Sequence, residues 1–213
     1  MKHLLIVGAG GFGRELAGAA QGALGFGADF DLKGFLDARP DALDGFAGYP
    51  PVLGDPAEYE PEPDDVFATA LGNIASRRRC AVALEGRGAR FIAIVHRTAV
   101  LGPNVSVGDG TFIAPHVTLT ADVKVGRHAC IFHNTSVGHD ARIGDFAHVY
   151  AQCAVGGGVE IGEGAMLYPG SQVVPRRRIG ADATVGIGST VLADVPEGTT
   201  VFGSPAKPLP SFG

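Results

Sequence analysis

The sequence predicts two structural parts: a small α/β domain over residues 1–95, and a parallel β-helix shaped as a triangular prism over residues 96–195. Three observations carry this prediction. Short apolar runs alternate with helix-like segments up to about residue 95, and beyond it Leu, Ile or Val recurs at every sixth position. Glycine is also in excess, with 33 among 213 residues, about twice its usual share of roughly 7%. Residues 196–213 are expected to form a C-terminal tail.

The composition excludes several classes of protein. The glycines follow no every-third-residue period, which excludes collagen, and a hydrophobic content of 46% argues against a disordered chain. A net charge of −5 argues against nucleic acid or an anionic membrane as a partner, because proteins that bind either are basic on the binding surface.

Two further features predict a cytoplasmic protein. The apolar run before the first glycines is too short for a signal peptide, and no run is long enough for membrane insertion. The three cysteines, Cys80, Cys130 and Cys153, lack the CxxC spacing and are expected to be reduced and mostly buried.

The first 95 residues alternate in a way that predicts a parallel sheet with crossover helices. The segment 38–65 contains six prolines and is predicted to be a loop. The expected elements are, in chain order, strand 3–7, helix 12–24, strand 32–37, strand 66–71, helix 74–85 and strand 91–95.

A glycine-rich turn joins the first predicted strand to the first helix. Gly8, Gly10 and Gly13 have the GxGxxG spacing, and Asp37 ends the next predicted strand. This context is typical of a nucleotide-binding turn, in which the helix N-terminus holds phosphate. Taken alone the motif indicates a dinucleotide, but about four strands make only half of such a Rossmann-like domain, which fits one nucleotide. A tight turn needed only for helix packing is the alternative.

The hexad repeat predicts how the prism is built. If each block of six is a short strand and a turn, three blocks close one coil of 18 residues, and sixteen blocks make about five coils. The residue after the aliphatic is Gly in nine of the sixteen blocks, which we interpret as backbone freedom at the bends. The residue two before it is usually small or Val, until Arg177 breaks the pattern. The repeated aliphatic, predicted to face the interior, stands at 101, 107, 113, 119, 125, 131, 137, 143, 149, 155, 161, 167, 173, 179, 185 and 191.

Three motifs together resemble a known enzyme family. They are the opening VGAGGFGRE, the segment NTSVGHDARIGDFAHV and the ending VFGSPAKPLP. With the hexads, they resemble the hexapeptide-repeat, left-handed β-helix acetyltransferases of the sialic-acid O-acetyltransferase and nucleotide-amino-sugar N-acetyltransferase family. The resemblance covers nearly the whole chain. It implies acetyl transfer from acetyl-CoA to a sugar, commonly a nucleotide-linked amino sugar made for surface glycans, by a homotrimer.

The resemblance also implies roles for particular residues. The histidine that matches His139 is the general base and the acid that matches Asp140 supports it, while the histidine that matches His148 lies close to the acetyl-CoA thioester. One departure stands out: where the family often has Asn directly after the inward aliphatic, this chain has Phe132, and Asn134 lies two positions further on. The implied contacts with the nucleotide-sugar substrate are Gly8, Gly10, Gly11, Gly13, Asp37 and the turn Leu71-Gly72-Asn73.

The hexad register gives this assignment a physical basis. His139 is two residues past an inward aliphatic and should point outward, and histidine is a good general base because its ordinary pKa is about 6.5. Gly157 is 18 residues further on, one coil away, where a bare backbone would admit the pantetheine arm of the cofactor and offer N–H groups to the oxyanion. His148 is half a coil from His139, on another face, so the two histidines can share a site only across a subunit boundary.

Several alternatives remain open from the sequence. A sialic-acid or other sugar O-acetyltransferase fits the same motifs. A γ-type carbonic anhydrase also uses a triangular prism, and the spacing of His128 and His133 is partly metal-like, but no third histidine stands at the stacked position. No metal is therefore expected. A non-catalytic scaffold that only binds a sugar nucleotide is a further possibility, and Arg176-Arg177-Arg178 fits either a CoA phosphate site or a solvated loop.

Overall fold

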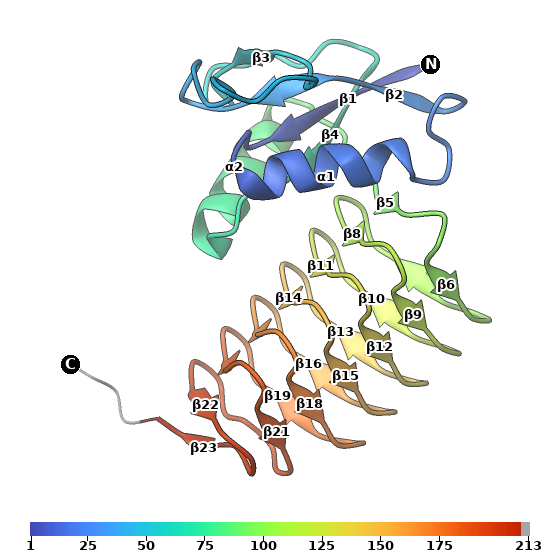
Figure 1. Ribbon diagram of the computed structural model, residues 1–213, viewed down its shortest axis with the longest axis vertical. Helices are drawn as coiled ribbons and strands as arrows, with labels where there is room; N and C mark the ends of the chain where they lie inside the picture. Colours follow the sequence, from blue (N-terminus) through green and yellow to red (C-terminus); the bar gives the residue numbers. More distant parts are fainter. Residues whose placement is uncertain (210–213) are drawn as a thin grey trace. The chain divides into compact units, whose positions relative to one another are not determined.

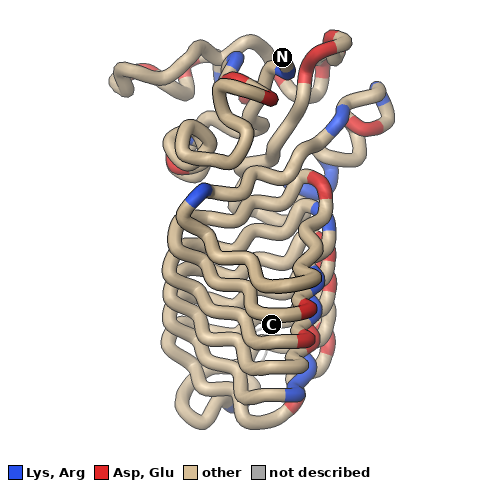
Figure 2. The backbone as a smooth tube through the Cα atoms, turned by 90° about the vertical axis from the view of Figure 1, so that its right-hand side faces the viewer, with Lys and Arg blue, Asp and Glu red and all other residues tan. Residues whose placement is uncertain are grey.

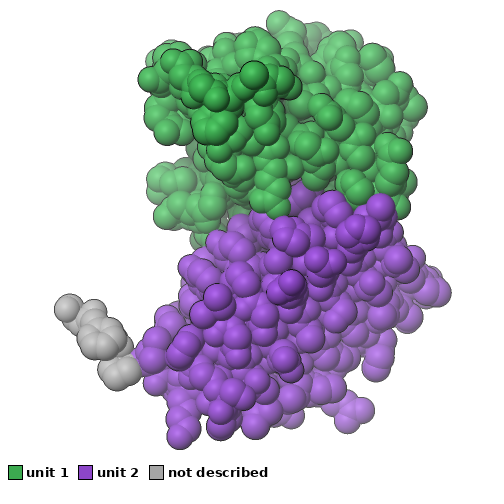
Figure 3. All heavy atoms as spheres, in the orientation of Figure 1, with its two compact units in different colours: residues 1–97 green, residues 98–213 purple. Residues whose placement is uncertain are grey.

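The computed structural model describes residues 1–209 and divides the chain into two compact units (Figure 3). The first unit spans Met1–Arg97 and the second begins at Thr98. The first contains both helices of the described residues, and the second is built from short strands (Figure 1).

The first unit is a four-stranded parallel sheet in the order β3-β2-β1-β4. This is half of a doubly wound Rossmann-like sheet. The apolar run of β1 lies at its centre, with Leu4, Leu5, Ile6 and Val7 fully buried. Its elements are β1 (Lys2–Val7), α1 (Gly11–Gln21), β2 (Phe30–Leu36), β3 (Val52–Gly54), β4 (Asp65–Thr69), α2 (Ile74–Gly86) and β5 (Ile94–Val95).

Three details of the first unit differ from the sequence prediction. Helix α1 ends at Gln21 rather than at 24, because Gly22 closes its last turn through an N–H bond to the Ala19 carbonyl. The predicted loop 38–65 contains the edge strand β3, which pairs with β2. The predicted strand 91–95 supplies only β5 and an isolated bridge from Phe91 to Phe67, so the fourth strand of the sheet is β3.

The second unit is a left-handed parallel β-helix of three flat faces, as predicted. Strands on one face pair in parallel with strands 18 residues away, for example Lys124 with Arg142. Its first face contains β6 (Val100–Leu101), β9 (Thr118–Leu119), β12 (Ser136–Val137), β15 (Ala154–Val155), β18 (Gln172–Val173) and β21 (Thr190–Val191). The second contains β7 (Ser106–Val107), β10 (Lys124–Val125), β13 (Arg142–Ile143), β16 (Glu160–Ile161) and β19 (Arg178–Ile179). The third contains β8 (Phe112–Ile113), β11 (Cys130–Ile131), β14 (His148–Val149), β17 (Met166–Leu167), β20 (Thr184–Val185), β22 (Thr200–Phe202) and β23 (Lys207–Pro208).

The predicted register of the prism is confirmed residue by residue. Each of the sixteen aliphatics is the second residue of a strand, from Leu101 in β6 to Val191 in β21. From Ile113 onward each is at most 4% exposed. The small residues two positions earlier are buried beside them, as Ala129 and Ala147 illustrate. These two columns fill the interior of the prism, which explains why the repeat tolerates almost no other residue type there.

The interpretation of the glycine that follows each aliphatic is wrong. The left-handed backbone lies two residues later, at the third position after the aliphatic, where His116, Asn134 and Asp140 have φ near 60°. The glycine after the aliphatic instead allows close stacking of coils. A β-carbon on Gly144 would lie 2.6 Å from the Glu163 backbone nitrogen, and one on Gly138 would lie 2.5 Å from that of Gly157.

The described part of the expected tail continues the prism. Val195 forms a bridge with Ile179, β22 pairs in parallel with β20, and β23 turns back to pair antiparallel with β22. Val201 takes up the inward position and is 4% exposed. Residues 196–209 therefore cover the last coil, while the end of the predicted tail, 210–213, lies outside the described residues.

Two further expectations concern burial. Cys130 and Cys153 are buried and Cys80 is half-buried, and none of the three forms a disulfide within residues 1–209. Across residues 1–209, neither helix has the length and apolar content that crossing a bilayer requires.

Candidate active site

The corner of the prism that follows β12 carries His139 and Asp140. His139 Nδ1 lies 2.7 Å from Asp140 Oδ2, and the two side chains are 70% and 67% exposed. Asp140 occupies the left-handed bend with φ 60°, a conformation in which Asp and Asn are enriched among non-glycine residues. The bend turns the carboxylate toward the neighbouring ring, so the imidazole is oriented from one side and stays accessible from the other.

Gly157 lies directly beside the His139 ring, one coil further along. A β-carbon on Gly157 would be 2.7 Å from His139 Nε2. The backbone ties the two coils together here, because Gly158 donates its N–H to the His139 carbonyl at 2.7 Å and Gly157 accepts from Arg176 at 2.9 Å. Within residues 1–209 the Gly157 N–H itself donates no hydrogen bond. His139 Nε2 therefore lies beside a half-exposed glycine, Gly157.

His148 lies on a different face from His139. It belongs to β14, whereas His139 follows β12, and it is only 1% exposed. Its ring is stacked against Phe132 at 4.9 Å and against Tyr150 at 4.2 Å between centroids. A single prism does not bring the two histidines together, and contact between His148 and a thioester stays a prediction.

Phe132 is a structural member of this aromatic stack. It is 6% exposed and meets Phe112 edge-to-face at 5.8 Å, in addition to its contact with His148. Tyr150 continues the stack to Tyr168 at 5.0 Å. Asn134 takes up an exposed left-handed bend. The position where the resemblance expects an Asn is therefore filled by a ring that packs on His148.

The glycine turn of the first unit divides into two kinds of position. Gly8 has φ +106°, and a β-carbon on Gly13 would overlap the Gly8 carbonyl oxygen, so both glycines are required by the backbone. A β-carbon on Gly10 or Gly11 would meet nothing within 4 Å. Gly10 and Gly11 thus border open space at the N-terminus of α1, where backbone N–H groups favour an anion.

Asp37 holds this turn in place. Its Oδ2 accepts the Ala9 N–H at 2.9 Å, and its Oδ1 accepts the Arg39 N–H at 3.0 Å. Burial raises the pKa of this carboxyl, but the hydrogen bonds from Ala9 and Arg39 outweigh it and hold the pKa below its ordinary value. The Asp37 carboxylate is therefore ionised and anchors the loop that would surround a ligand.

The second predicted turn lies at the adjacent strand. Strands β1 and β4 are neighbours and their carboxyl ends carry the Gly8 turn and the Leu71-Gly72-Asn73 turn. This is the point where the strand order reverses, at which open α/β sheets bind ligands. Gly72 has open space at its α-carbon, whereas the Asn73 side chain caps α2 by accepting the Ser76 N–H at 2.8 Å.

Two arginines near this turn were not foreseen. Arg39 reaches back to Asp37, with Nε 3.2 Å from Oδ1, and Arg14 in the first turns of α1 lies 3.6 Å above the Phe46 ring. The signal for Arg14 was its place directly after the glycine motif, while Arg39 lies in a segment that has no pattern. Both bring positive charge to the side of the sheet where the glycine turn lies.

The three consecutive arginines point to different places. Arg178 pairs with Glu160 at 3.0 Å and Arg177 with Asp194 at 3.6 Å. Arg176 is exposed and makes no ion pair within residues 1–209; its Cγ lies 3.5 Å from where a Gly158 β-carbon would be. Of the three, only Arg176 lies next to the catalytic corner, since it takes the bend position of Asp140 and Gly158 one coil further along.

The described residues do not form the metal site that a γ-type carbonic anhydrase would need. His128 is 1% exposed and stacks on Phe146 at 4.8 Å between centroids. Over residues 1–209, no three or more His, Cys, Asp or Glu side chains gather in an arrangement that could hold a metal ion.

Comparison with known proteins adds independent observations. A family model described as PglD N-terminal domain matches residues 3–84, and one described as GMPPB C-terminal domain matches residues 91–193. Among curated proteins, none matches this chain in sequence.

Solved structures match nearly the whole chain. A histidine-to-asparagine variant of perosamine N-acetyltransferase from Caulobacter crescentus, in complex with CoA and GDP-perosamine, is 27% identical with a TM-score of 0.88, covering 99% of this chain and 98% of that one. The acetyltransferase domain of PglB from Neisseria gonorrhoeae, in complex with acetyl coenzyme A, is 27% identical with a TM-score of 0.74, covering 98% and 99%. WeeI from Acinetobacter baumannii is 26% identical with a TM-score of 0.79, covering 98% and 100%.

Fold and comparisons together define the class of the protein: it is an acyltransferase built on a hexapeptide-repeat β-helix. Within that class, residues 3–84 match the PglD N-terminal domain model, and nearly the whole chain is similar to the perosamine N-acetyltransferase of Caulobacter crescentus.

Proposed function

We propose that this enzyme transfers the acetyl group of acetyl-CoA to the amino group of a nucleotide-linked amino sugar, with His139 as the general base. One observation carries the assignment of the reacting centre. His139 is tied to Asp140 through Nδ1, and its Nε2 lies beside Gly157, whose N–H donates no hydrogen bond within the described residues.

The reaction follows from this geometry. The amine nitrogen of the sugar attacks the thioester carbonyl carbon, and its proton passes to His139 Nε2. The Gly157 N–H would donate a hydrogen bond to the oxyanion that forms. The Asp140 carboxylate stabilises the resulting imidazolium. The carbon–sulfur bond then breaks, and the protonated imidazole returns the proton to the CoA thiolate.

The acceptor assignment rests on the first unit and on the relatives. The Caulobacter crescentus enzyme holds GDP-perosamine together with CoA. In this chain the open N-terminus of α1 at Gly10 and Gly11 would hold phosphate. Gly8, Gly13 and Asp37 shape that turn, and Gly72 and Asn73 border it from the neighbouring strand.

A homotrimer would complete each active site between two subunits. His139 is exposed at one corner of the prism, and the aromatic stack that covers His148 lies on another face. Three-fold packing of the prisms would bring such a corner against such a face of the next subunit. Sedimentation equilibrium is expected to give three times the chain mass, and an active monomer would contradict shared sites. With reduced thiols and acetyl-CoA as donor, we place the reaction in the cytoplasm.

The experiment that tests the function is thiol release. Acetyl-CoA is incubated with a panel of UDP- and GDP-linked amino sugars and with sialic acid, and CoA release is followed with and without each acceptor. An amino sugar nucleotide is expected to give release that His139→Ala abolishes. Release with sialic acid alone would favour O-acetylation. No release with any acceptor, together with no CoA binding, would remove the enzymatic assignment.

A further inference from the structure

An aromatic ring beside the glycine turn stays exposed although a cation is stacked on it. The Arg14 guanidinium carbon lies 3.6 Å from the centre of the Phe46 ring, yet Phe46 is 47% exposed. Tyr49, three residues further along the same segment, is also a large exposed side chain. Exposed apolar groups that gather next to a candidate site, rather than lie scattered, mark a surface on which a ligand can bind.

Packing of Tyr49 fixes this segment next to the glycine turn. Its ring meets the Phe35 ring edge-to-face, with 6.3 Å between centroids. Phe35 is fully buried, and its ring lies 3.5 Å from where a β-carbon on Gly13 would stand. The position of the segment is therefore set by the folded first unit and does not need a ligand.

The stacked pair lies one helical turn from the open phosphate position. Arg14 donates its N–H to the Gly10 carbonyl at 3.0 Å, which is the hydrogen bond of the first turn of α1. One turn advances about 5.4 Å along the helix axis, comparable with the span of a ribose between its 5′ oxygen and its base. A nucleotide with its phosphate at Gly10 and Gly11 would therefore bring its base to the Phe46 ring.

Arg39 presents hydrogen-bond donors at the rim of the same turn. Asp37 accepts from Arg39 Nε at 3.2 Å and from Nη2 at 3.4 Å, and the Asp37 carboxylate is itself fixed by the Ala9 N–H at 2.9 Å. These bonds leave the Nη1 group and the outer hydrogen of Nη2 for a ligand. The Arg39 side chain is 66% exposed, so this edge of the guanidinium is accessible.

A fork of donors of this kind distinguishes one base from the others. Guanine presents O6 and N7 as two adjacent acceptors, and a guanidinium matches them with two parallel hydrogen bonds. Adenine places an amino donor next to N7, and uracil has only one acceptor at the corresponding edge. The free edge of Arg39 therefore favours guanine.

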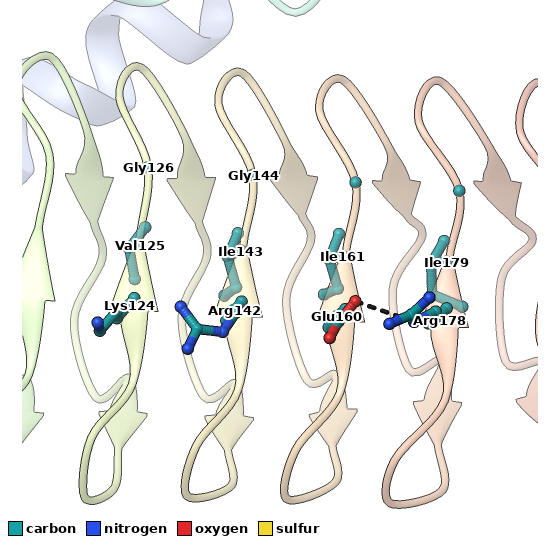
Figure 4. Close-up of a pocket in the computed structure, with 12 residues that line it drawn as sticks. Lys124, Val125, Gly126, Arg142, Ile143, Gly144, Glu160, Ile161, Arg178 and Ile179 are labelled. Carbon is teal, nitrogen blue, oxygen red and sulfur yellow. Dashed lines mark ion pairs between the residues drawn. The ribbon is translucent and has the colours of Figure 1, made fainter.

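The arginines of the β-helix are placed differently. In the view of Figure 2 its charged residues gather along one edge of the prism, while its broad faces are mostly uncharged. Glu160 stands in register between Arg142 and Arg178 and pairs with Arg178 at 3.0 Å, as Figure 4 shows. Within residues 1–209 neither of these two arginines is stacked on an aromatic ring. The combination of an exposed ring and two cations therefore distinguishes the glycine turn.

We propose that the rim of the glycine turn holds a guanine base, so that the acceptor is a guanosine diphosphate sugar. The base stacks on the pair formed by Arg14 and Phe46, because every base has a π-face and arginine adds a cation–π contribution. Arg39, held by Asp37, donates to O6 and N7 of the base. The identity of the acceptor rests on the proposed function, but binding of the nucleotide can be measured without any reaction.

The test is calorimetric titration of the full chain with GDP, UDP and ADP. Wild type is expected to bind GDP about tenfold or more tightly than UDP or ADP, as for one bidentate contact with a base. Phe46→Ala should weaken the binding of all three nucleotides about tenfold, since stacking is shared by every base. Arg39→Lys keeps the charge but loses the fork, so it should weaken GDP binding about tenfold and leave UDP binding unchanged.

Two controls separate the base from the phosphates. Val82→Ala removes an exposed apolar side chain from α2 and should leave every affinity unchanged. Inorganic pyrophosphate has no base, so all variants should bind it as wild type does.

Three outcomes would contradict these assignments in different ways. Binding of GDP that is no tighter than that of UDP or ADP would overturn the choice of guanine. Unchanged nucleotide affinities in a folded Phe46→Ala variant would overturn the base site. A wild type that binds GDP as expected but acetylates no GDP-linked amino sugar would contradict the proposed function alone.

Discussion

The imidazole of His139 lies against the bare backbone of Gly157, one coil further along the prism, with Nε2 2.7 Å from where a β-carbon would stand. The two residues are 18 apart in sequence. Their contact is a direct result of the hexad register, since equivalent positions of successive coils lie one strand spacing apart.

Gly157→Ala is expected to lower kcat by about 100-fold. The added methyl group would push the His139 imidazole out of position, and moving a catalytic group by about 1 Å lowers the rate by about this factor. The coil itself should tolerate the change. Ala121, Ala151 and Ala181 occupy the same position of other blocks. Thiol-release kinetics and thermal unfolding measure the two effects. Ala151→Gly is the matched control and should leave both unchanged; a wild-type rate in Gly157→Ala would show that the ring does not act from this position.

Asp140→Asn isolates the charge of the carboxylate. Asn accepts the left-handed bend as readily as Asp, so the fold should persist. The rate should fall by about tenfold to 100-fold, the value of one hydrogen bond to a charged group. His139→Ala should cost about 100-fold to 10,000-fold. Combining both substitutions should add little to His139→Ala, and an additive loss would mean that Asp140 acts independently of the histidine.

Gly13→Ala and Gly11→Ala should separate the structural role of the glycine turn from its binding role. A β-carbon at Gly13 would overlap the Gly8 carbonyl, so Gly13→Ala is expected to destabilise the first unit by about 1–3 kcal/mol. A β-carbon at Gly11 meets nothing within 4 Å, so Gly11→Ala should keep the stability and raise KM for the sugar nucleotide. Urea unfolding measures the stability of both variants, and initial rates give their KM for the sugar nucleotide. If Gly11→Ala leaves KM unchanged, the turn serves helix packing alone.

The first unit is expected to lose stability in acid through Asp65. Burial raises the pKa of this carboxyl, but hydrogen bonds from Lys33, the Glu62 N–H and Tyr59 outweigh it and hold the pKa below its ordinary value. A lowered pKa in the folded state contributes stability above the unfolded pKa of about 3.9, and this is lost as pH falls through the folded pKa. Urea unfolding, followed by the helical circular-dichroism band, should show Asp65→Asn less stable than wild type at neutral pH. The difference should shrink in acid, and an equal difference at both pH values would contradict the assignment.

Much of this protein was determined by local sequence. The period of six places an aliphatic in the second residue of every strand from β6 to β21, because an interior of fixed cross-section accepts one size of side chain at each turn. The same register placed His139 beside Gly157. Alternating apolar runs and helix-like segments likewise foretold β1, β2, β4, α1 and α2.

Tertiary structure decided what no local pattern encodes. Strand β3 is only three residues long and lies in a proline-rich segment. It forms because it pairs with the edge of β2. Where glycine follows the aliphatic, it is required because the backbone of the next coil lies too close for a β-carbon. This is a contact between residues far apart in sequence. The pairing of Glu160 with Arg178 depends on the same stacking. Charges and backbone atoms 18 residues apart meet only once the coils are closed, so these relationships follow from the folded prism and not from any one block of six.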